Sequence, residues 1–174
     1  MERKTKLNCR MILEFKNVHH GWTNLLFSFS DYMIKINFSA VCDTFPDFLN
    51  WVNKVDDLNI KKTCWVNIDQ EGYNKKLIVN NIDGELIRLK VTTEKFFSFQ
   101  IILNKEYFVC QLAKVLNNYI VDYPNEHWAG GNLDEIIEKN CSQFINKYKN
   151  KCKYKTDCLK SCERFKTSPT TGST

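Results

Sequence analysis

A histidine and a tryptophan stand side by side in the segment YPNEHWAGGNLDEI, between two stretches that have helical periodicity. His127 titrates near neutral pH, so it can act as a general base, as a metal ligand or as a structural anchor bonded to a carbonyl. No serine, cysteine or second histidine partner can be identified for it. The Gly130-Gly131 pair and Asn132 fit a corner before a helix cap. We therefore expect His127 and Trp128 to build a recognition surface and not a catalytic site, while a purely structural corner remains the alternative.

A second candidate site is the predicted turn in WVNIDQEGY. Asp69 and Glu71 lie two positions apart, between Trp65 and Tyr73. Paired carboxylates can perform acid–base chemistry or bind a cation, but carboxylates in an exposed turn are more often simply solvated. Aromatic side chains are common anchors of protein interfaces. We expect these four residues to contribute to binding and expect no catalytic residue among them.

The chain contains eight cysteines and three histidines, residue types that can bind metal ions. Cys141, Cys152, Cys158 and Cys162 lie in the C-terminal quarter, where they can bind metal, pair with one another or stay reduced. Their spacing is not that of a zinc finger or zinc ribbon. The pair His19-His20 precedes a glycine, and adjacent strand residues point to opposite faces, so a hairpin turn is expected there. We expect neither a metal nor another cofactor.

The basic charge of the chain is concentrated at its C-terminal end. The net charge is +5, and residues 146–174 alone contain eight Lys and Arg against two acidic residues. Such a segment, approximately residues 146–166, is a candidate contact for nucleic acid or another anion, with a solvated helix end as the alternative. The charged start MERKTKLN leads into no apolar region, and no apolar run is long enough to span a bilayer. We expect a cytoplasmic protein that does not contact membranes.

Alternating apolar positions predict seven strands. The inward residues of the first three are Met11–Phe15, Leu25–Phe29 and Ile34–Phe38, taken at every second position. Four more strands follow from the same alternation over 64–68, 77–79, 87–91 and 97–103. Short turns between them, such as Asp83-Gly84, indicate an antiparallel arrangement.

Three helices follow from apolar positions at helical spacing. Thr44 with Asp47 resembles a capping box for a helix that ends at Asp56-Asp57. Asn104 is the expected cap of a second helix that ends before Pro124, and Asn132 caps a third. The order of elements is therefore β-β-β-α-β-β-β-β-α-α. We predict an α+β fold with one antiparallel sheet (an N-terminal hairpin plus a meander) packed by helices, in a single domain over 1–150, followed by a basic, cysteine-containing, poorly ordered tail over 151–174.

Both candidate segments also carry a resemblance to known proteins. CWVNIDQEGYNKKLIV resembles a W-D-x-E-x-G-x-Y-like turn, and YPNEHWAGGNLDEI resembles a late E-x-x-W-G motif. These motifs occur in a group of short, mostly uncharacterised bacterial proteins, some of which are immunity-protein-like. The present chain departs from the first motif at Val66-Asn67, where Trp-Asp stands in the group. The likeness covers residues 10–145, and it transfers no catalytic residue.

Two functions of different classes follow. The first is a non-enzymatic protein-binding domain, an immunity- or antitoxin-like partner of a bacterial toxin or defence component. The second is a module that binds nucleic acid or another anion through its basic C-terminal segment. The two differ in their dependence on salt, because the binding of phosphates weakens steeply as salt concentration rises.

Overall fold

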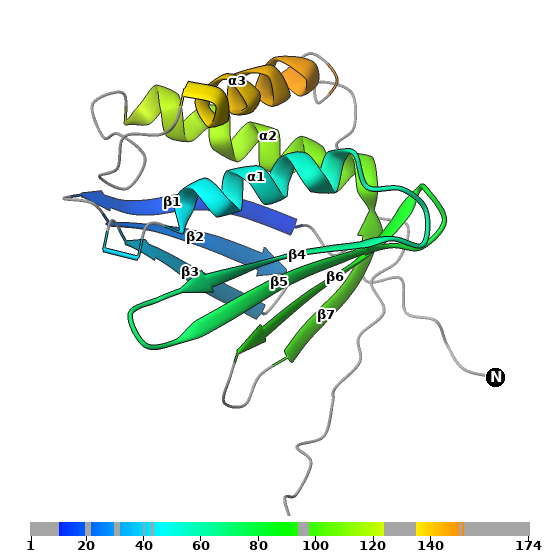
Figure 1. The fold of residues 1–174 in the computed structure, drawn as a ribbon, viewed down its shortest axis with the longest axis horizontal. Helices are drawn as coiled ribbons and strands as arrows, with labels where there is room; N and C mark the ends of the chain where they lie inside the picture. Colours follow the sequence, from blue (N-terminus) through cyan, green and yellow to red (C-terminus); the bar gives the residue numbers. More distant parts are fainter. Residues whose placement is uncertain are drawn as a thin grey trace, which may run out of the picture.

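Ten helices and strands build the described part of the protein, and they follow one another in the predicted order (Figure 1). The computed structural model describes residues 11–19, 22–29, 32–39, 41–42, 44–93, 98–123, 135–149 and 151. The elements are β1 (Met11–His19), β2 (Trp22–Phe29), β3 (Tyr32–Ser39), α1 (Phe45–Asp56), β4 (Thr63–Asp69), β5 (Asn74–Asn81), β6 (Leu86–Thr93), β7 (Ser98–Asn104), α2 (Lys105–Asp122) and α3 (Glu135–Lys149). The predicted α+β class is confirmed.

The strands form two antiparallel sheets instead of a single one. The first sheet has the order β1-β2-β3 and the second the order β4-β5-β6-β7. Tight connections explain the pairing within each sheet, because consecutive strands joined by a few residues fold back on each other. Between β3 and β4 the chain instead forms α1, so no hairpin turn sets a register between these two strands.

Side chains join the two sheets where backbone pairing stops. Gln70 Nε2 donates to the carbonyl of Asn37 on β3 at 3.1 Å, and Lys75 Nζ donates to the carbonyl of Lys35. The hydroxyl of Ser39 donates to Glu71 Oε1 at 2.8 Å. These bonds all involve residues at or next to the turn between β4 and β5. The turn end of that hairpin is therefore held against β3.

Helix α1 begins where the sequence indicates but is capped differently. Thr44 has helical backbone angles, its side chain makes no capping bond, and its hydroxyl is buried without a partner among the described residues. The predicted capping box of Thr44 and Asp47 is therefore wrong. A threonine caps only when its own backbone stays extended, which turns its oxygen toward the first free amides. Pro46 in the first turn and the end of the helix at Asp56 agree with the sequence.

The cap of α2 is as predicted. Asn104 has an extended backbone, and its Oδ1 accepts the amide hydrogen of Tyr107 at 2.9 Å. The helix ends at Asp122. The expected cap of α3 at Asn132 lies outside the described residues, and so does the tail over 152–174; α3 itself ends at Lys149.

All three helices lie on one side of the sheets, with α3 outermost (Figure 1). Both sheets turn their apolar faces toward them, so strands and helices share one core. Phe108 and Leu112 of α2 are fully buried in it and Phe144 of α3 nearly so, as predicted. The side chain of Ile137, the fourth residue expected in this core, is not among those described. Aromatic rings fill much of the space between the first sheet and the helices; Phe15 contacts Phe38, Phe45 and Tyr119.

Candidate functional site

The turn between β4 and β5 carries three of the predicted site residues. Glu71 and Gly72 both have positive φ angles, 58° and 99°, which is the requirement of a two-residue type I′ turn. The amide of Gln70 donates to the carbonyl of Tyr73 across the turn at 2.9 Å. A type I′ turn matches the twist of its flanking strands, so it fixes where β4 and β5 pair.

Asp69 and Glu71 both have structural partners in this turn. Asp69 Oδ1 accepts the amide hydrogen of Gly72 at 3.2 Å, and Glu71 accepts the hydroxyl of Ser39. Ser39 is buried and also accepts the amide of Val41. The structure therefore brings Asp69, Glu71 and Tyr73 together, with the two carboxylates engaged in holding the turn and joining it to β3.

Trp65 lies near the start of β4, away from the turn that holds the other three residues. It is four positions from Asp69, about 13 Å along the strand. Its side chain is 53% exposed, a high value for a tryptophan, and Lys76 Nζ lies 4.1 Å from the centre of its ring. Lys76 is opposite Asn67 on the neighbouring strand, so this cation–π contact is a diagonal pair across the sheet. The contact holds the indole in place while leaving it exposed.

A groove of about 780 Å³ lies beside Trp65, between α1 and β4. We call it the α1–β4 groove. One wall is a stripe of α1 residues at helical spacing, and the other is a run of five consecutive residues of β4. Its lining consists of Asp47, Asn50, Trp51, Lys54, Thr63, Cys64, Trp65, Val66 and Asn67. The volume is within the usual range of binding sites.

The β4 wall of the groove is the edge of a sheet. Among the described strands, β4 pairs with β5 alone. Antiparallel residues alternate between pairs that exchange hydrogen bonds and pairs that do not. At the turn, Gln70 and Tyr73 form a hydrogen-bonded pair. Every second pair from there along the strands should be hydrogen-bonded as well. The bond from the Asn81 amide to the Lys62 carbonyl at the far end agrees with this count. Cys64, Val66 and Ile68 therefore bond to β5.

The residues between them direct their backbone groups away from β5. These are Thr63, Trp65 and Asn67, all in the part of β4 that lines the groove. Among the described residues, no hydrogen bond reaches their amide or carbonyl groups from the open side. The groove thus contains a row of backbone donors and acceptors that no other described residue engages.

The α1 wall has opposite charges at its two ends. Lys54 lies near Cys64, where its charge acts on the thiol. Asp47 lies seven residues earlier, about 10 Å along the helix. The short connection 57–62 makes α1 and β4 antiparallel, so Asp47 stands toward the Asn67 end. Between them, the buried Nε1 of Trp51 has no acceptor among the described residues.

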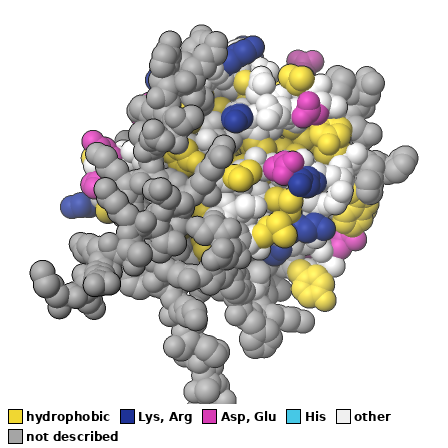
Figure 2. All heavy atoms as spheres, turned by 180° about the vertical axis from the view of Figure 1, so that it is seen from behind, with side chains coloured by type: hydrophobic (Ala, Val, Ile, Leu, Met, Phe, Trp, Pro, Cys, Tyr) yellow, Lys and Arg dark blue, Asp and Glu magenta, His cyan; other side chains and the backbone are white. Residues whose placement is uncertain are grey.

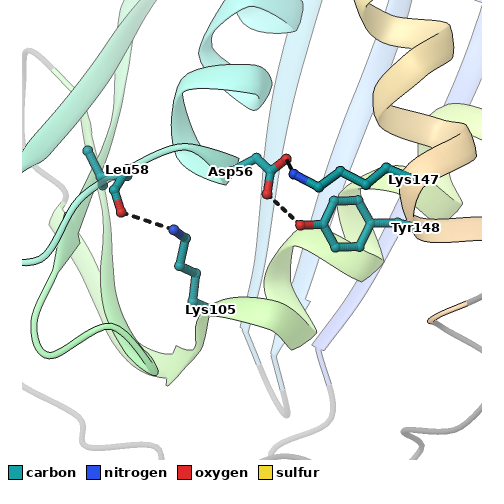
Figure 3. Close-up of polar contacts among 5 residues, drawn as sticks. All are labelled: Asp56, Leu58, Lys105, Lys147 and Tyr148. Atoms are coloured by element: carbon teal, nitrogen blue, oxygen red, sulfur yellow. Dashed lines mark hydrogen bonds and ion pairs between the residues drawn. The ribbon is translucent and has the colours of Figure 1, made fainter.

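A second hollow, of about 510 Å³, lies near the ends of α1 and α3. Here Asp56 accepts hydrogen bonds from Tyr148 at 2.5 Å and from Lys147 at 2.6 Å (Figure 3). Burial, and then the bond to Asp56, raise the pKa of Tyr148 above its ordinary value. Lys105 donates to the carbonyl of Leu58 beside them. We name Asp56, Lys147 and Tyr148 the α1–α3 clamp, because they fasten the outer helix to α1.

The described cysteines are free thiols. Burial raises the pKa of Cys64 to about 11 and that of Cys141 to about 12. Both thiols are therefore protonated and weakly nucleophilic at neutral pH. Within the described ranges, no group of three or more His, Cys, Asp or Glu side chains is arranged to hold a metal ion. Cys152, Cys158 and Cys162 lie outside those ranges.

His127 and Trp128 also lie outside the described residues, so their part in a site stays a prediction. The residues of the α1 wall of the groove were not among the predicted site residues. Asp47, Asn50, Trp51 and Lys54 have spacings of three and four, which place them on one helical face. That spacing was available in the sequence, but the position of this face against the β4 edge was not.

The described surface has mixed character. Viewed from behind, basic, acidic and hydrophobic side chains are interspersed (Figure 2). In the described part of the chain, no helix combines the length and the apolar character that crossing a bilayer demands. Comparison with known proteins finds no family model, no curated protein and no solved structure that matches this chain.

Proposed function

We propose that this protein is a non-enzymatic protein-binding domain, an immunity- or antitoxin-like partner of a bacterial toxin or defence component, which acts in the cytoplasm. The observation that carries the proposal is the free edge of β4 in the α1–β4 groove, with the exposed Trp65 beside it. Exposed tryptophans are enriched among the residues that dominate protein interfaces.

The chemistry of the predicted turn favours binding over catalysis. A catalytic carboxylate must be free to exchange a proton with a substrate. Asp69 and Glu71 are instead acceptors in bonds that shape the turn and connect it to β3. The buried thiols of Cys64 and Cys141 are held in their unreactive form. A binding role needs neither a proton-exchanging carboxylate nor a reactive thiol, so it is compatible with these engaged and buried side chains.

The test is capture of a partner from the native cytosol by the full chain, followed by calorimetric titration. Trp65→Ala should raise the Kd for the captured partner about 30-fold, because a dominant interface residue is lost. Val121→Ala, which truncates an exposed side chain on α2, is the control and should leave Kd unchanged. An unchanged Kd for Trp65→Ala would contradict the proposed role of this surface. His127→Ala and Trp128→Ala test the second predicted segment in the same titration.

A second candidate function, anion or nucleic-acid binding, is favoured by one feature of the second sheet. Its outer face carries Lys76, Arg88 and Lys90 on neighbouring strands, and the residues paired with them across β4–β7 include no acidic side chain. In the basic C-terminal segment, which the sequence also makes a candidate for this function, Lys147 is paired with Asp56. Titration with single-stranded nucleic acid at rising salt decides between the two, because phosphate binding must weaken steeply.

A further inference from the structure

The free edge of β4 differs from both edges of the first sheet. At β3, side chains of Gln70 and Lys75 bond to the edge carbonyls. β1 carries an irregularity between Lys16 and His19, and bulges of this kind disturb an edge. Proteins protect exposed edges with such devices, with lysine or with proline. β4, TCWVNID, has regular pairing throughout and contains neither lysine nor proline.

We propose that the α1–β4 groove binds an extended segment of the partner protein, which adds to the second sheet as a strand beside β4. The inference rests on the proposed protein-binding function and specifies its mode. The amide and carbonyl groups of Thr63, Trp65 and Asn67 make the new backbone hydrogen bonds. Strand addition of this kind obtains affinity from main-chain bonds and specificity from the flanking side chains.

The walls of the groove determine which segment fits. Lys54 at the Cys64 end selects an acidic side chain, and Asp47 at the Asn67 end selects a basic one. From Thr63 to Asn67 the edge is about 13 Å long, so the bound segment is about five residues of extended chain. Trp65 projects from the sheet face, where it can cover one side chain of the added strand.

A second copy of this chain fits the groove poorly. Its own β4 edge is also walled by α1, so two copies meeting edge to edge would bring the two helices into the same space. A single extended segment has no such wall and can enter between α1 and β4. The groove therefore favours a lone strand over a sheet edge.

Asn67→Pro tests the mode of binding. It removes one outward amide, and proline is tolerated in an edge strand where the lost N–H faces away from the ladder. Asn67→Ala keeps the amide and is the matched control. We expect Asn67→Pro to weaken the affinity for the bound segment about tenfold, because one main-chain hydrogen bond is lost. Asn67→Ala should change that affinity little. Thermal unfolding of both variants checks that the fold is retained.

The probe is the tightest-binding synthetic peptide selected from a displayed library of random linear decapeptides on the full chain. Amide hydrogen exchange, measured by NMR on the unmodified protein, should slow at Trp65 and Asn67 when this peptide binds. Because the unmodified protein is used, this measurement decides the question even if Asn67→Pro does not fold. A library without binders, or a bound peptide that leaves both amides exchanging freely, overturns the proposal.

Two further outcomes separate this inference from the proposed function. If a captured partner loses affinity for Trp65→Ala but not for Asn67→Pro, protein binding stands and strand addition is wrong. If the free protein is a dimer in sedimentation and Asn67→Pro makes it monomeric, a second copy occupies the edge and the inference is likewise overturned.

Discussion

At the scale of single residues, burial determines the chemistry of the thiols. Cys64 and Cys141 lie in the core, where a thiolate would lose its hydration, so their pKa values rise to about 11 and about 12. The thiol form is favoured in the folded state. With respect to these thiols the fold is therefore most stable below pH 9, and stability falls as pH rises from 9 through 11 and 12, because the unfolded state loses its thiol protons first.

We therefore predict that both thiols react slowly with iodoacetamide at pH 8 in the folded protein and readily after unfolding in urea. Cys42 is partly exposed and should be alkylated before them. Peptide mass spectrometry after timed quenching measures the order. Equal rates for Cys42, Cys64 and Cys141 in the folded state would show that the two core thiols are accessible.

At the scale of elements, the α1–α3 clamp connects the outer helix to the rest of the fold. Asp56 is mostly buried and accepts from both Tyr148 and Lys147, which are 92 and 91 positions away. A carboxylate at the C-terminal end of a helix is disfavoured by the helix dipole. The two donors from α3 offset this cost, and Asp56 thereby receives a structural role.

We predict that Asp56→Ala lowers the free energy of unfolding by about 1–3 kcal/mol, because the buried hydroxyl of Tyr148 loses its acceptor. Asp56→Asn keeps an acceptor oxygen and removes only the ion pair with half-exposed Lys147. It should cost less than about 1 kcal/mol. Urea unfolding measures both variants. The same loss for both would indicate that the charge of Asp56, and not its acceptor oxygen, stabilises the contact.

At the scale of the whole molecule, the core is the shared interior of two sheets and three helices. Leu112 lies on the buried face of α2 and is fully inaccessible, whereas Val121 on the same helix is 66% exposed. Removing buried methyl groups costs transfer free energy and leaves a cavity, while the exposed site loses little.

Leu112→Ala should therefore lower the free energy of unfolding by about 2–5 kcal/mol. Val121→Ala, the matched truncation on the same helix, should change it by less than about 0.5 kcal/mol. Both values come from urea titration followed by circular dichroism. If the two variants unfold at the same urea concentration, Leu112 does not belong to the core.

Local features of the sequence were sufficient for the order of elements and for much of the core. The alternation in Val66 and Ile68, the helical spacing from Phe108 to Leu112, and the Asn104 cap all express physics that acts within a few residues. Thr44 was mispredicted because a cap depends on the backbone angles of one residue, which its type does not set.

The candidate site depended on contacts between distant residues. The sequence predicted Trp65 as a binding residue near a turn, and it could not show that Asp47 and Lys54 face the β4 edge. That arrangement follows from the position of α1, which connects β3 to β4 and lies beside β4, so that among the described strands β5 is the one that pairs with β4. The division into two sheets has the same origin. Side chains of Gln70 and Lys75 meet the carbonyls of β3 only after the hairpin and β3 have come together in the folded chain. Periodicity specifies which face of an element is buried, and only tertiary packing decides which edge stays open.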